Sequence, residues 1–314
     1  VLAPVLGSYH GVAISCGLNP LYGDIDTYHS AASAMDEALR NLTAVGASLE
    51  RAAVLDNFCW GNTNRTDQLG TLVRAALACY DYAMGFGVPF ISGKDSLNNE
   101  FNTGEEVISI PPTLLISAMA VVDDVRRCVT MDLKEAGNPL YLVGMTYPEL
   151  GGSHYYDLFG LTGSSVPEVR NPVAQRTMDA VCQAIQNGLV RSCHDLSEGG
   201  LGVAAAEMAF SGELGVDINL GHAPWDGERD YHMDATVLFS ESNSRFVVEV
   251  PATKTDEFEA ALGDLPFDCI GEVTSDPVLC IDGLDGRRVM DAELAALKES
   301  WQTPLVEHKP VELA

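Results

Sequence analysis

The sequence alternates short apolar segments with longer segments of helical spacing, and this alternation restricts the possible folds more than any other feature. Four apolar segments predict strands, at residues 12–15, 51–55, 88–91 and 113–122. Two segments between them predict helices, at residues 28–45 and 68–84. In the second helix six apolar residues share one face: Leu69, Leu72, Val73, Ala76, Leu77 and Tyr80. The order strand–helix–strand–helix–strand predicts an α/β domain.

A second set of elements begins after residues 131–137, where we expect the boundary between two domains. Further strands are predicted at residues 141–144, 189–193, 246–250 and 269–273. Further helices are predicted at residues 171–187, 203–210 and 292–301. A length of 314 residues is sufficient for two domains with separate cores. We therefore expect domains at residues 1–133 and 134–314.

The charge of the chain argues against two classes of partner. It has 45 acidic side chains and 18 basic ones, a formal net charge of −27. So negative a protein repels nucleic-acid backbones and anionic lipid, so we expect neither nucleic acid nor membrane as a partner. Small phosphorylated ligands stay possible, because backbone N–H groups, metal ions and a few basic side chains can hold them locally.

The cysteines and the beginning of the chain indicate where the protein works. Eight cysteines are scattered without a C-x-x-C spacing, which favours reduced thiols over disulfides or a zinc site. No signal peptide and no run of about 18 apolar residues is present, so we expect a cytoplasmic location. Because the first residue is Val1, we interpret the chain as a piece of a longer protein.

Three glycine-containing polar segments each follow a predicted strand. The segment at residues 91–100 places Gly93 beside Lys94 and Ser96, an arrangement that can hold an anion, although a simple turn explains it about as well. The segment at residues 56–62 begins with Asp56, which can contact a nucleotide or a metal-bound water, or form an Asx-turn.

The third polar segment, residues 194–202, and one helix offer oxygen ligands for a cation. Asp195 and Ser197 precede a glycine pair at a predicted helix start, where they could hold Mg²⁺ or, in the alternative, cap the helix. Glu37 and Asn41 are four residues apart and project from one helix face. Such a pair can bind a cation, but on an acidic protein it is more often a solvated face.

The order of these motifs resembles a known family. Residues 56–62 (DNFCWGN), 93–100 (GKDSLNNE) and 112–125 (PTLLISAMAVVDDV) resemble the second half of the synthetase component of phosphoribosylformylglycinamidine synthase. Three further motifs continue the match in the same order, at residues 150–155 (LGGSHY), 194–201 (HDLSEGGL) and 238–246 (LFSESNSRF). The resemblance covers nearly the whole chain, and six ordered motifs are far more specific than any one of them.

The resemblance implies a fold. Members of this family are two-domain α/β (α+β) units related to aminoimidazole ribonucleotide synthetase. Their N-terminal domain contributes strands to a barrel shared with a twin unit, and their C-terminal domain packs a mixed sheet against helices. In this family the twin is the other half of the same polypeptide.

The resemblance also implies a reaction. ATP activates the amide oxygen of formylglycinamide ribonucleotide, and ammonia from glutamine then displaces phosphate to give formylglycinamidine ribonucleotide in purine biosynthesis. The implied cofactors are ATP and Mg²⁺. The implied partners are the N-terminal half of the synthetase, a glutamine amidotransferase domain or subunit, and a small accessory subunit.

The resemblance assigns roles to residues one by one. It implies that Asp56 and Gly93 contact ATP and that Ser96 contacts substrate. Where many small members carry an Asn that ligates Mg²⁺, this chain has Lys94, which cannot ligate a metal while protonated and which we expect to pair with phosphate.

The remaining implied residues belong to a second nucleotide site. The resemblance implies that Glu37, Asn41, Asp195 and Ser197 surround a non-reacting nucleotide with its Mg²⁺. It implies no catalytic residue in this half, because the family's acid–base groups lie in the half that precedes it. We therefore expect the chain to supply one wall of an active site and to be inactive alone.

Two alternative functions stay open from the sequence. One is a self-sufficient homodimeric relative acting on another substrate. The other is a scaffold that holds a trapped ADP and docks the amidotransferase. A homodimer is also expected if this half is isolated, because its barrel-forming face would then lack its twin.

Overall fold

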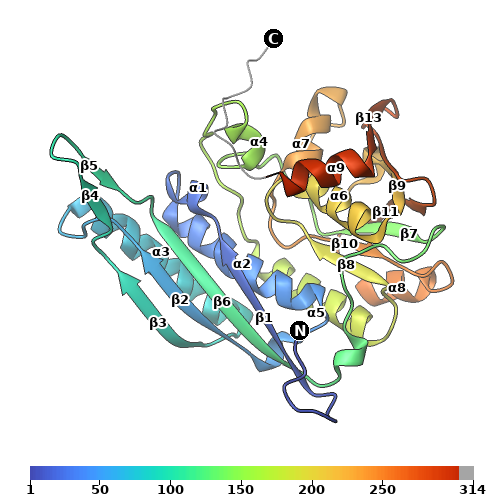
Figure 1. Cartoon of the computed structure of the whole chain (residues 1–314), viewed down its shortest axis with the longest axis horizontal. Coiled ribbons are helices and arrows are strands. Elements are labelled where there is room, and N and C mark those ends of the chain that lie inside the picture. The colour runs from blue at the N-terminus through green and yellow to red at the C-terminus, as the bar shows by residue number, and fades with distance from the viewer. Residues whose placement is uncertain (304–314) are drawn as a thin grey trace.

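The computed structural model describes residues 1–303, which form two sheets with helices packed on them (Figure 1). The first sheet has the strand order β1-β6-β2-β3, with β1 (Gly11–Leu18), β6 (Thr113–Val122), β2 (Ala52–Cys59) and β3 (Phe90–Ser96). β6 pairs antiparallel with both β1 and β2, and β2 pairs parallel with β3. The parallel pair is joined through a helix, as parallel neighbours require.

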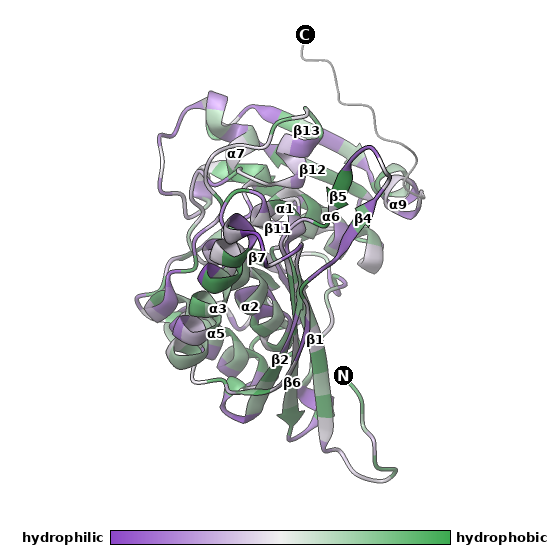
Figure 2. Ribbon diagram, turned by 90° about the vertical axis from the view of Figure 1, so that its left-hand side faces the viewer, coloured by the Kyte–Doolittle hydropathy of each residue, from purple (hydrophilic) through white to green (hydrophobic). Residues whose placement is uncertain are grey.

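Two long helices cover one face of this sheet. They are α2 (Thr27–Ala44) and α3 (Thr66–Phe86). α2 begins at Asp26, whose carboxylate accepts hydrogen bonds from the backbone N–H groups of Tyr28 and His29. Its leucines Leu39 and Leu42 are fully buried, and burial of each stabilises the fold by roughly 1.5–3 kcal/mol. Figure 2 shows the sheet edge-on, with α2, α3 and α5 on the same side of it.

The other face of the first sheet is bare. Ile14 on β1 is 58% exposed and its antiparallel partner Met119 on β6 is 50% exposed, although both lie in the middle of their strands. Leu55 on β2 and Cys16 on β1 point to this same face, by the alternation of exposed and buried residues along each strand. We call the face that carries these four residues the bare face.

The second sheet has seven strands. Its order is β13 (Arg288–Glu293), β12 (Val278–Asp282), β9 (Gly215–Asn219), β11 (Phe267–Thr274), β7 (Pro139–Val143), β10 (Phe246–Glu249) and β8 (Ser192–Asp195). The β9–β12 pair is parallel and the other pairs are antiparallel, so the sheet is mixed. Its β7–β10–β8 end is covered on both faces.

Helices on the two sides of this sheet belong to two cores. One side carries α6 (Gly200–Gly212), α7 (Asp234–Phe239) and α9 (Leu294–Gln302). The other side carries α5 (Asn171–Gln186) and α8 (Thr255–Leu262), whose buried side chains join the core under α2 and α3. The core shared by α2, α3, α5 and α8 therefore includes residues on both sides of the predicted boundary at residue 133. Whether the chain divides into domains there stays a prediction.

Short elements complete the described chain. They are α1 (Pro20–Gly23), α4 (His154–Asp157), the hairpin of β4 (Glu100–Asn102) and β5 (Val107–Ser109), and the 3₁₀ turns η1 (Leu49–Arg51), η2 (Val125–Arg127), η3 (Leu220–His222) and η4 (Tyr231–Met233). Within residues 1–303, no helix combines the length and the apolar character that crossing a bilayer would require.

The predicted α/β class is confirmed, but three segments predicted as loops are parts of strands. β2 continues through Asp56 to Cys59, β3 runs through Gly93 to Ser96, and β8 ends at Asp195 rather than at Cys193. Polar residues continue a strand here because neighbouring strands supply hydrogen-bond partners. Asp56, for example, lies between Gly93 of β3 and Ile116 of β6.

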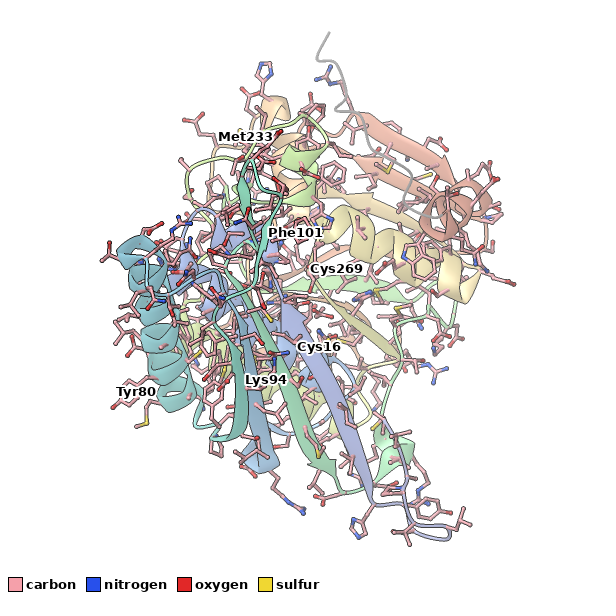
Figure 3. All side chains as sticks on the ribbon, turned by 60° about the vertical axis from the view of Figure 1, so that its left-hand side comes forward. Cys16, Tyr80, Lys94, Phe101, Met233 and Cys269 are labelled. Atoms are coloured by element: carbon pink, nitrogen blue, oxygen red, sulfur yellow. The ribbon has the colours of Figure 1, made fainter. Side chains whose placement is uncertain are left out.

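The apolar face predicted for the second helix exists but points outward. Leu69, Val73, Leu77 and Tyr80 are 46–67% exposed. The buried side of α3 carries small and aromatic side chains: Ala75, Ala78, Cys79, Tyr82 and Phe86. Figure 3 shows Tyr80 on the outer side of α3. The prediction that this helix forms is confirmed, and periodicity alone did not reveal which face is buried.

Candidate functional site

One cavity brings together four of the predicted site residues. It measures about 420 Å³ and is lined by Glu37 and Asn41 of α2, Asp195 at the end of β8, and Ser197 just before α6. α2 supplies its two side chains because residues four apart lie on one helix face. A helix packed on the first sheet and a strand of the second sheet thus both contribute to the cavity.

A buried arginine holds the two halves of the cavity together. Arg40 of α2 is 2% exposed and forms ion pairs with Asp36 and, at 3.4 Å, with Asp195. Its Nη2 also donates to Ser197 Oγ at 2.9 Å, and Ser197 Oγ donates to Asp195 Oδ2 at 2.8 Å. Burial opposes the charge on Arg40, but Asp36 and Asp195 outweigh it and raise its pKa.

A histidine between two carboxylates forms the opposite wall. His194 Nε2 lies 2.8 Å from Glu207 Oε2, and Nδ1 lies 3.6 Å from Asp195 Oδ1. Burial lowers the pKa of His194, but hydrogen bonds to Asp195 and Glu207 outweigh this and raise it to about 10. Burial also opposes the charge on Asp195, and His194 with Arg40 lowers its pKa to about 2. At neutral pH this wall therefore holds a charged imidazolium.

An exposed tryptophan stands at the edge of the cavity. Trp301 of α9 is 60% exposed, and its indole N–H donates to Glu207 Oε1 at 2.8 Å. Its ring also contacts Phe210 of α6, with 5.7 Å between centroids. The hydrogen bond and the ring contact fix the orientation of the indole. A flat face of about the size of a nucleotide base is thus presented at the cavity edge.

Glu37 has a strongly shifted pKa inside this cavity. Its Oε2 accepts hydrogen bonds from Leu18 N–H at 2.9 Å and from Asn19 Nδ2 at 2.8 Å. Burial and the nearby Glu198 carboxylate nevertheless raise the pKa of Glu37 to about 7. A bound cation would reverse this shift, because it compensates the charge that burial and Glu198 oppose.

The start of α6 also faces the cavity, and its backbone requires glycine. Gly199 and Gly200 have φ values of +77° and +58°, and a Cβ on Gly200 would lie 2.3 Å from Ser240 O. The first turn of α6 places Gly200, Val203 and Ala204 along the cavity wall. The partial positive charge of a helix start is therefore directed at a cavity that is otherwise rich in carboxylates.

The residues predicted on β2 and β3 divide between the two faces of the first sheet. Asp56 is paired with Gly93, and a Cβ on Gly93 would lie 2.4 Å from Asp56 Oδ1. Both lie on the side of the helices, with the buried Val54 and Phe58. Burial raises the pKa of Asp56, against a hydrogen bond from the Lys94 backbone N–H.

Lys94 and Ser96 lie on the bare face. Lys94 is paired with Asn57, and its Nζ donates a hydrogen bond to Ser96 Oγ. Figure 3 labels Lys94 and Cys16 on strands of this sheet. A cation and a hydroxyl in contact on an otherwise uncovered surface are suited to an anionic group. The structure thus brings Asp56 together with Gly93, and Lys94 together with Ser96. The two pairs lie on opposite faces of the sheet.

No three His, Cys, Asp or Glu side chains within residues 1–303 are arranged as a metal site. The oxygen donors of Glu37 and Asn41 nevertheless suit Mg²⁺, which commonly uses one or two protein oxygens and completes its shell with water and phosphate. Asp195 is less available, because His194, Arg40 and Ser197 already occupy its oxygens. The donor set therefore fits a magnesium ion that arrives with a phosphorylated ligand.

Sequence reasoning missed Glu207 and Trp301, which line this cavity, and Arg40, which contacts its lining residues Asp195 and Ser197. Arg40 lies four positions after Asp36. On a helix this spacing favours an ion pair, so the sequence contained a signal for the Asp36–Arg40 pair. Glu207 follows Val203 by four residues and Gly200 by seven, so these positions share one face of α6. Nothing in the sequence indicated that Trp301 borders the cavity, because its position depends on the packing of α9 against α6.

Comparisons with known proteins agree with this architecture. Residues 135–281 match the family described as AIR synthase related protein, C-terminal domain. The phosphoribosylformylglycinamidine synthase subunit PurL of Deinococcus radiodurans is 34% identical over 312 residues, covering 96% of this chain and 40% of that protein. This chain therefore spans about two fifths of the length of that relative.

Solved structures show the same fold. T. maritima PurL complexed with FGAR has a TM-score of 0.79 at 21% identity, over 98% of this chain and 49% of that one. T. maritima PurL complexed with ATP has a TM-score of 0.72 at 21% identity, over 98% of this chain and 47% of that one.

Proposed function

This chain belongs to the AIR synthase-related superfamily, where it is similar to PurL, and on that premise we propose that it is the C-terminal half of a phosphoribosylformylglycinamidine synthase. The complete enzyme would convert formylglycinamide ribonucleotide, glutamine and ATP to formylglycinamidine ribonucleotide, ADP, phosphate and glutamate. This half would supply phosphate-binding and nucleotide-binding residues, and the preceding half would supply the acid–base groups.

The observation that carries the proposal is the convergence of Glu37, Asn41, Asp195 and Ser197 on one cavity. These residues come from distant parts of the sequence: α2, the end of β8 and the segment before α6. The cavity also combines a helix start with an exposed indole ring. These features support a nucleotide whose base contacts Trp301 and whose phosphates approach the start of α6.

The carboxylates of the cavity make a divalent cation necessary for this binding. Glu37, Glu198 and Glu207 would repel a nucleotide phosphate in the absence of a counter-charge. Mg²⁺, held by Glu37 and Asn41, would supply that charge. The imidazolium of His194 and the buried Arg40 would maintain the positions of the surrounding carboxylates.

Lys94 and Ser96 would serve the reacting substrate. Their hydrogen bond places an ammonium and a hydroxyl together on the bare face. We propose that they bind the phosphate of the ribonucleotide, and that the N-terminal half of the synthetase covers this face to complete a barrel. Asp56, beside Gly93 on the opposite face, would contact ATP from the edge of the sheet at β3.

Nucleotide binding can be tested through the fluorescence of Trp301. The chain has three tryptophans, and Trp60 and Trp225 are 1% and 7% exposed, so Trp301 dominates the solvent-sensitive signal. We expect ADP with Mg²⁺ to change this signal, and Trp301→Phe to remove the change. Asn41→Ala should weaken binding at least several-fold, whereas Asn64→Ala, on an exposed loop, should not. Equal binding by both Asn variants would contradict the proposed site.

Catalysis can be tested with the isolated chain and the complete synthetase. We expect the chain alone to form no ADP from ATP, formylglycinamide ribonucleotide and ammonia. In the complete synthetase, Lys94→Ala should raise KM for the ribonucleotide about tenfold, because one charge-assisted hydrogen bond is lost. Turnover by the isolated chain, or an unchanged KM, would refute the half-site assignment.

A scaffold role for the cavity is the second candidate, and its position between α2, β8 and α6 supports it. A nucleotide held there would connect α2 to β8 and α6 without taking part in the reaction. Glu37→Ala separates the two roles in the complete synthetase. Lost thermal stability with unchanged turnover would indicate a trapped structural nucleotide, and lost turnover with intact folding would indicate a reacting one.

The partners of the complete enzyme follow from the same similarity. The relative in Deinococcus radiodurans is named as a subunit, which supports an assembly with other chains. We propose that a glutamine amidotransferase supplies the ammonia, that a small accessory subunit joins the assembly, and that the enzyme works in the cytoplasm.

A further inference from the structure

A second cavity, which shares no residue with the cavity around Glu37 and Asp195, is lined by several basic side chains. It measures about 740 Å³ and lies between η2, the segment that follows it, the C-terminal end of α5 and the residue before β8. Four basic side chains line it: Arg126, Arg127, Lys134 and Arg191. No acidic residue is among the twelve that line it. We call it the arginine cavity.

This concentration of basic residues is unusual for the chain. Acidic side chains outnumber basic ones by 45 to 18, and the cavity with Glu37 and Asp195 is lined by four carboxylates. Most arginines of residues 1–303 are also paired with a carboxylate, as Arg51 is with Asp123 and Arg176 with Asp264. The arginine cavity therefore differs from the acidic composition of the chain. It also contains arginines without an ion pair, whereas most arginines of the described chain form one.

Two of the four basic side chains are already neutralised. Arg126 forms a two-pronged hydrogen bond with Asp124, at 2.9 and 2.6 Å, and stacks on the ring of Tyr9. Lys134 pairs with Asp132 at 2.6 Å. These two residues shape the wall but leave little charge for a ligand.

The other two form no ion pair with a carboxylate within 4.0 Å in the described part of the chain. Arg127 donates to the backbone oxygen of Gln186 at 3.2 Å, and it lies close enough to Asp124 to lower the pKa of that carboxyl. Both side chains are exposed to solvent. Together they offer two positive charges without a direct carboxylate partner and several N–H donors, which matches a doubly charged anion.

We propose that the arginine cavity binds a small phosphate monoester. Arg127 and Arg191 would hold the phosphate, whose oxygens match the geometry of the guanidinium group. Val129, Ile185 and Val190 line the same cavity and would contact the organic part of the ligand. The cavity lies beside the segment that joins β6 to β7, so an occupied site would also connect the two sheets at this point.

Binding can be measured by calorimetry on the 314-residue chain with glycerol 3-phosphate, and with glycerol as the uncharged comparison. We expect glycerol 3-phosphate to bind and glycerol not to bind. Arg127→Gln and Arg191→Gln should each weaken binding about tenfold, because each removes a charge-assisted hydrogen bond. The matched control Arg288→Gln removes an exposed arginine of β13 that pairs with Asp282, and it should bind normally.

Further measurements keep the proposal distinct from general electrostatics and from the proposed function. Lys94→Ala should leave this binding unchanged, so a loss there would assign the signal to the bare face and overturn the proposal. An equal loss in Arg288→Gln would show a non-specific charge effect, which also overturns it. Binding of a penta-glutamate peptide in place of glycerol 3-phosphate would identify an acidic polypeptide as the ligand instead. Thermal melts of each variant identify any loss that comes from unfolding.

Discussion

In the cavity lined by Glu37 and Asp195, the pKa values of two carboxyl groups are shifted in opposite directions. Asp195 and His194 stabilise one another's charged forms, so the pKa of Asp195 falls and that of His194 rises. Glu37 has no cation of its own at hydrogen-bonding distance in the described chain, and its pKa rises to about 7 instead. Glu37 is therefore the carboxylate most ready to gain from a bound metal ion.

The shifted pKa of Glu37 predicts a pH-dependent stability. A raised pKa means that the folded state binds the proton more tightly, so the stability from this group is complete below pH 4.5 and is lost as the pH rises through 7. We expect Glu37→Gln to raise the unfolding free energy by about 2–3 kcal/mol at pH 8 and to change it little at pH 4.5. Urea denaturation at both pH values measures this.

The control for this prediction is an exposed carboxylate. Glu50→Gln in η1 should change stability little at either pH, because Glu50 is exposed to water. Added Mg²⁺ should remove most of the advantage of Glu37→Gln at pH 8, because the ion compensates the charge of Glu37. A Glu37→Gln effect of the same size at both pH values would contradict the assigned burial cost.

At the scale of elements, α3 shows how a helix can be amphipathic and still bury its less apolar side. The stripe of Leu69, Val73, Leu77 and Tyr80 is exposed, while Ala75 and Ala78 contact the core. Small side chains let α3 lie close to α2, so shape as well as hydrophobicity decides the orientation. Sequence periodicity measures only hydrophobicity.

The orientation of α3 predicts opposite outcomes for neighbouring substitutions. Leu77→Ser should change the unfolding free energy by less than about 0.5 kcal/mol, because Leu77 is 54% exposed. Ala78→Leu should destabilise by about 1–3 kcal/mol, because Ala78 is fully buried and the added atoms have no space. Denaturant titration of both variants checks this, and the reverse order would show that the helix is rotated.

At the scale of the whole molecule, the first sheet is covered on one face, whereas the second is covered on both faces at its β7–β10–β8 end. The bare face includes Ile14 and Met119, which lie opposite each other on neighbouring strands. An antiparallel arrangement can expose one face to water, but such a face normally alternates to polar residues. The apolar pair at the middle of this face supports a covering partner, as the proposed barrel requires.

The bare face predicts self-association of the isolated chain. We expect a dimer in light scattering, because a second copy can cover the face that the other half would cover in the complete synthetase. Ile14→Glu should return the chain to monomer mass, because it places a charge in the contact. Val289→Glu, an exposed strand position on β13, should leave the dimer intact. A monomer in the unmodified chain would contradict this assembly.

Much of the architecture could be predicted from sequence because local patterns determine it. The 3.6-residue spacing gave α2, α3 and α5 to within two residues, and the strand at 113–122 is β6 as predicted. The cavity residues Glu37 and Asn41 share a helix face for the same local reason. The ordered motifs also identified the superfamily before any coordinates.

Tertiary structure decided what depends on distant neighbours. Strands β2 and β3 extend into polar sequence because adjacent strands pair with them, and that extension sends Asp56 and Lys94 to opposite faces. Packing of separate elements likewise decides the partners of Arg40 and the position of Trp301. It also decides that Arg127 and Arg191 of the arginine cavity form no ion pair. Local sequence sets the spacing of side chains along an element, whereas only packing sets what each side chain meets.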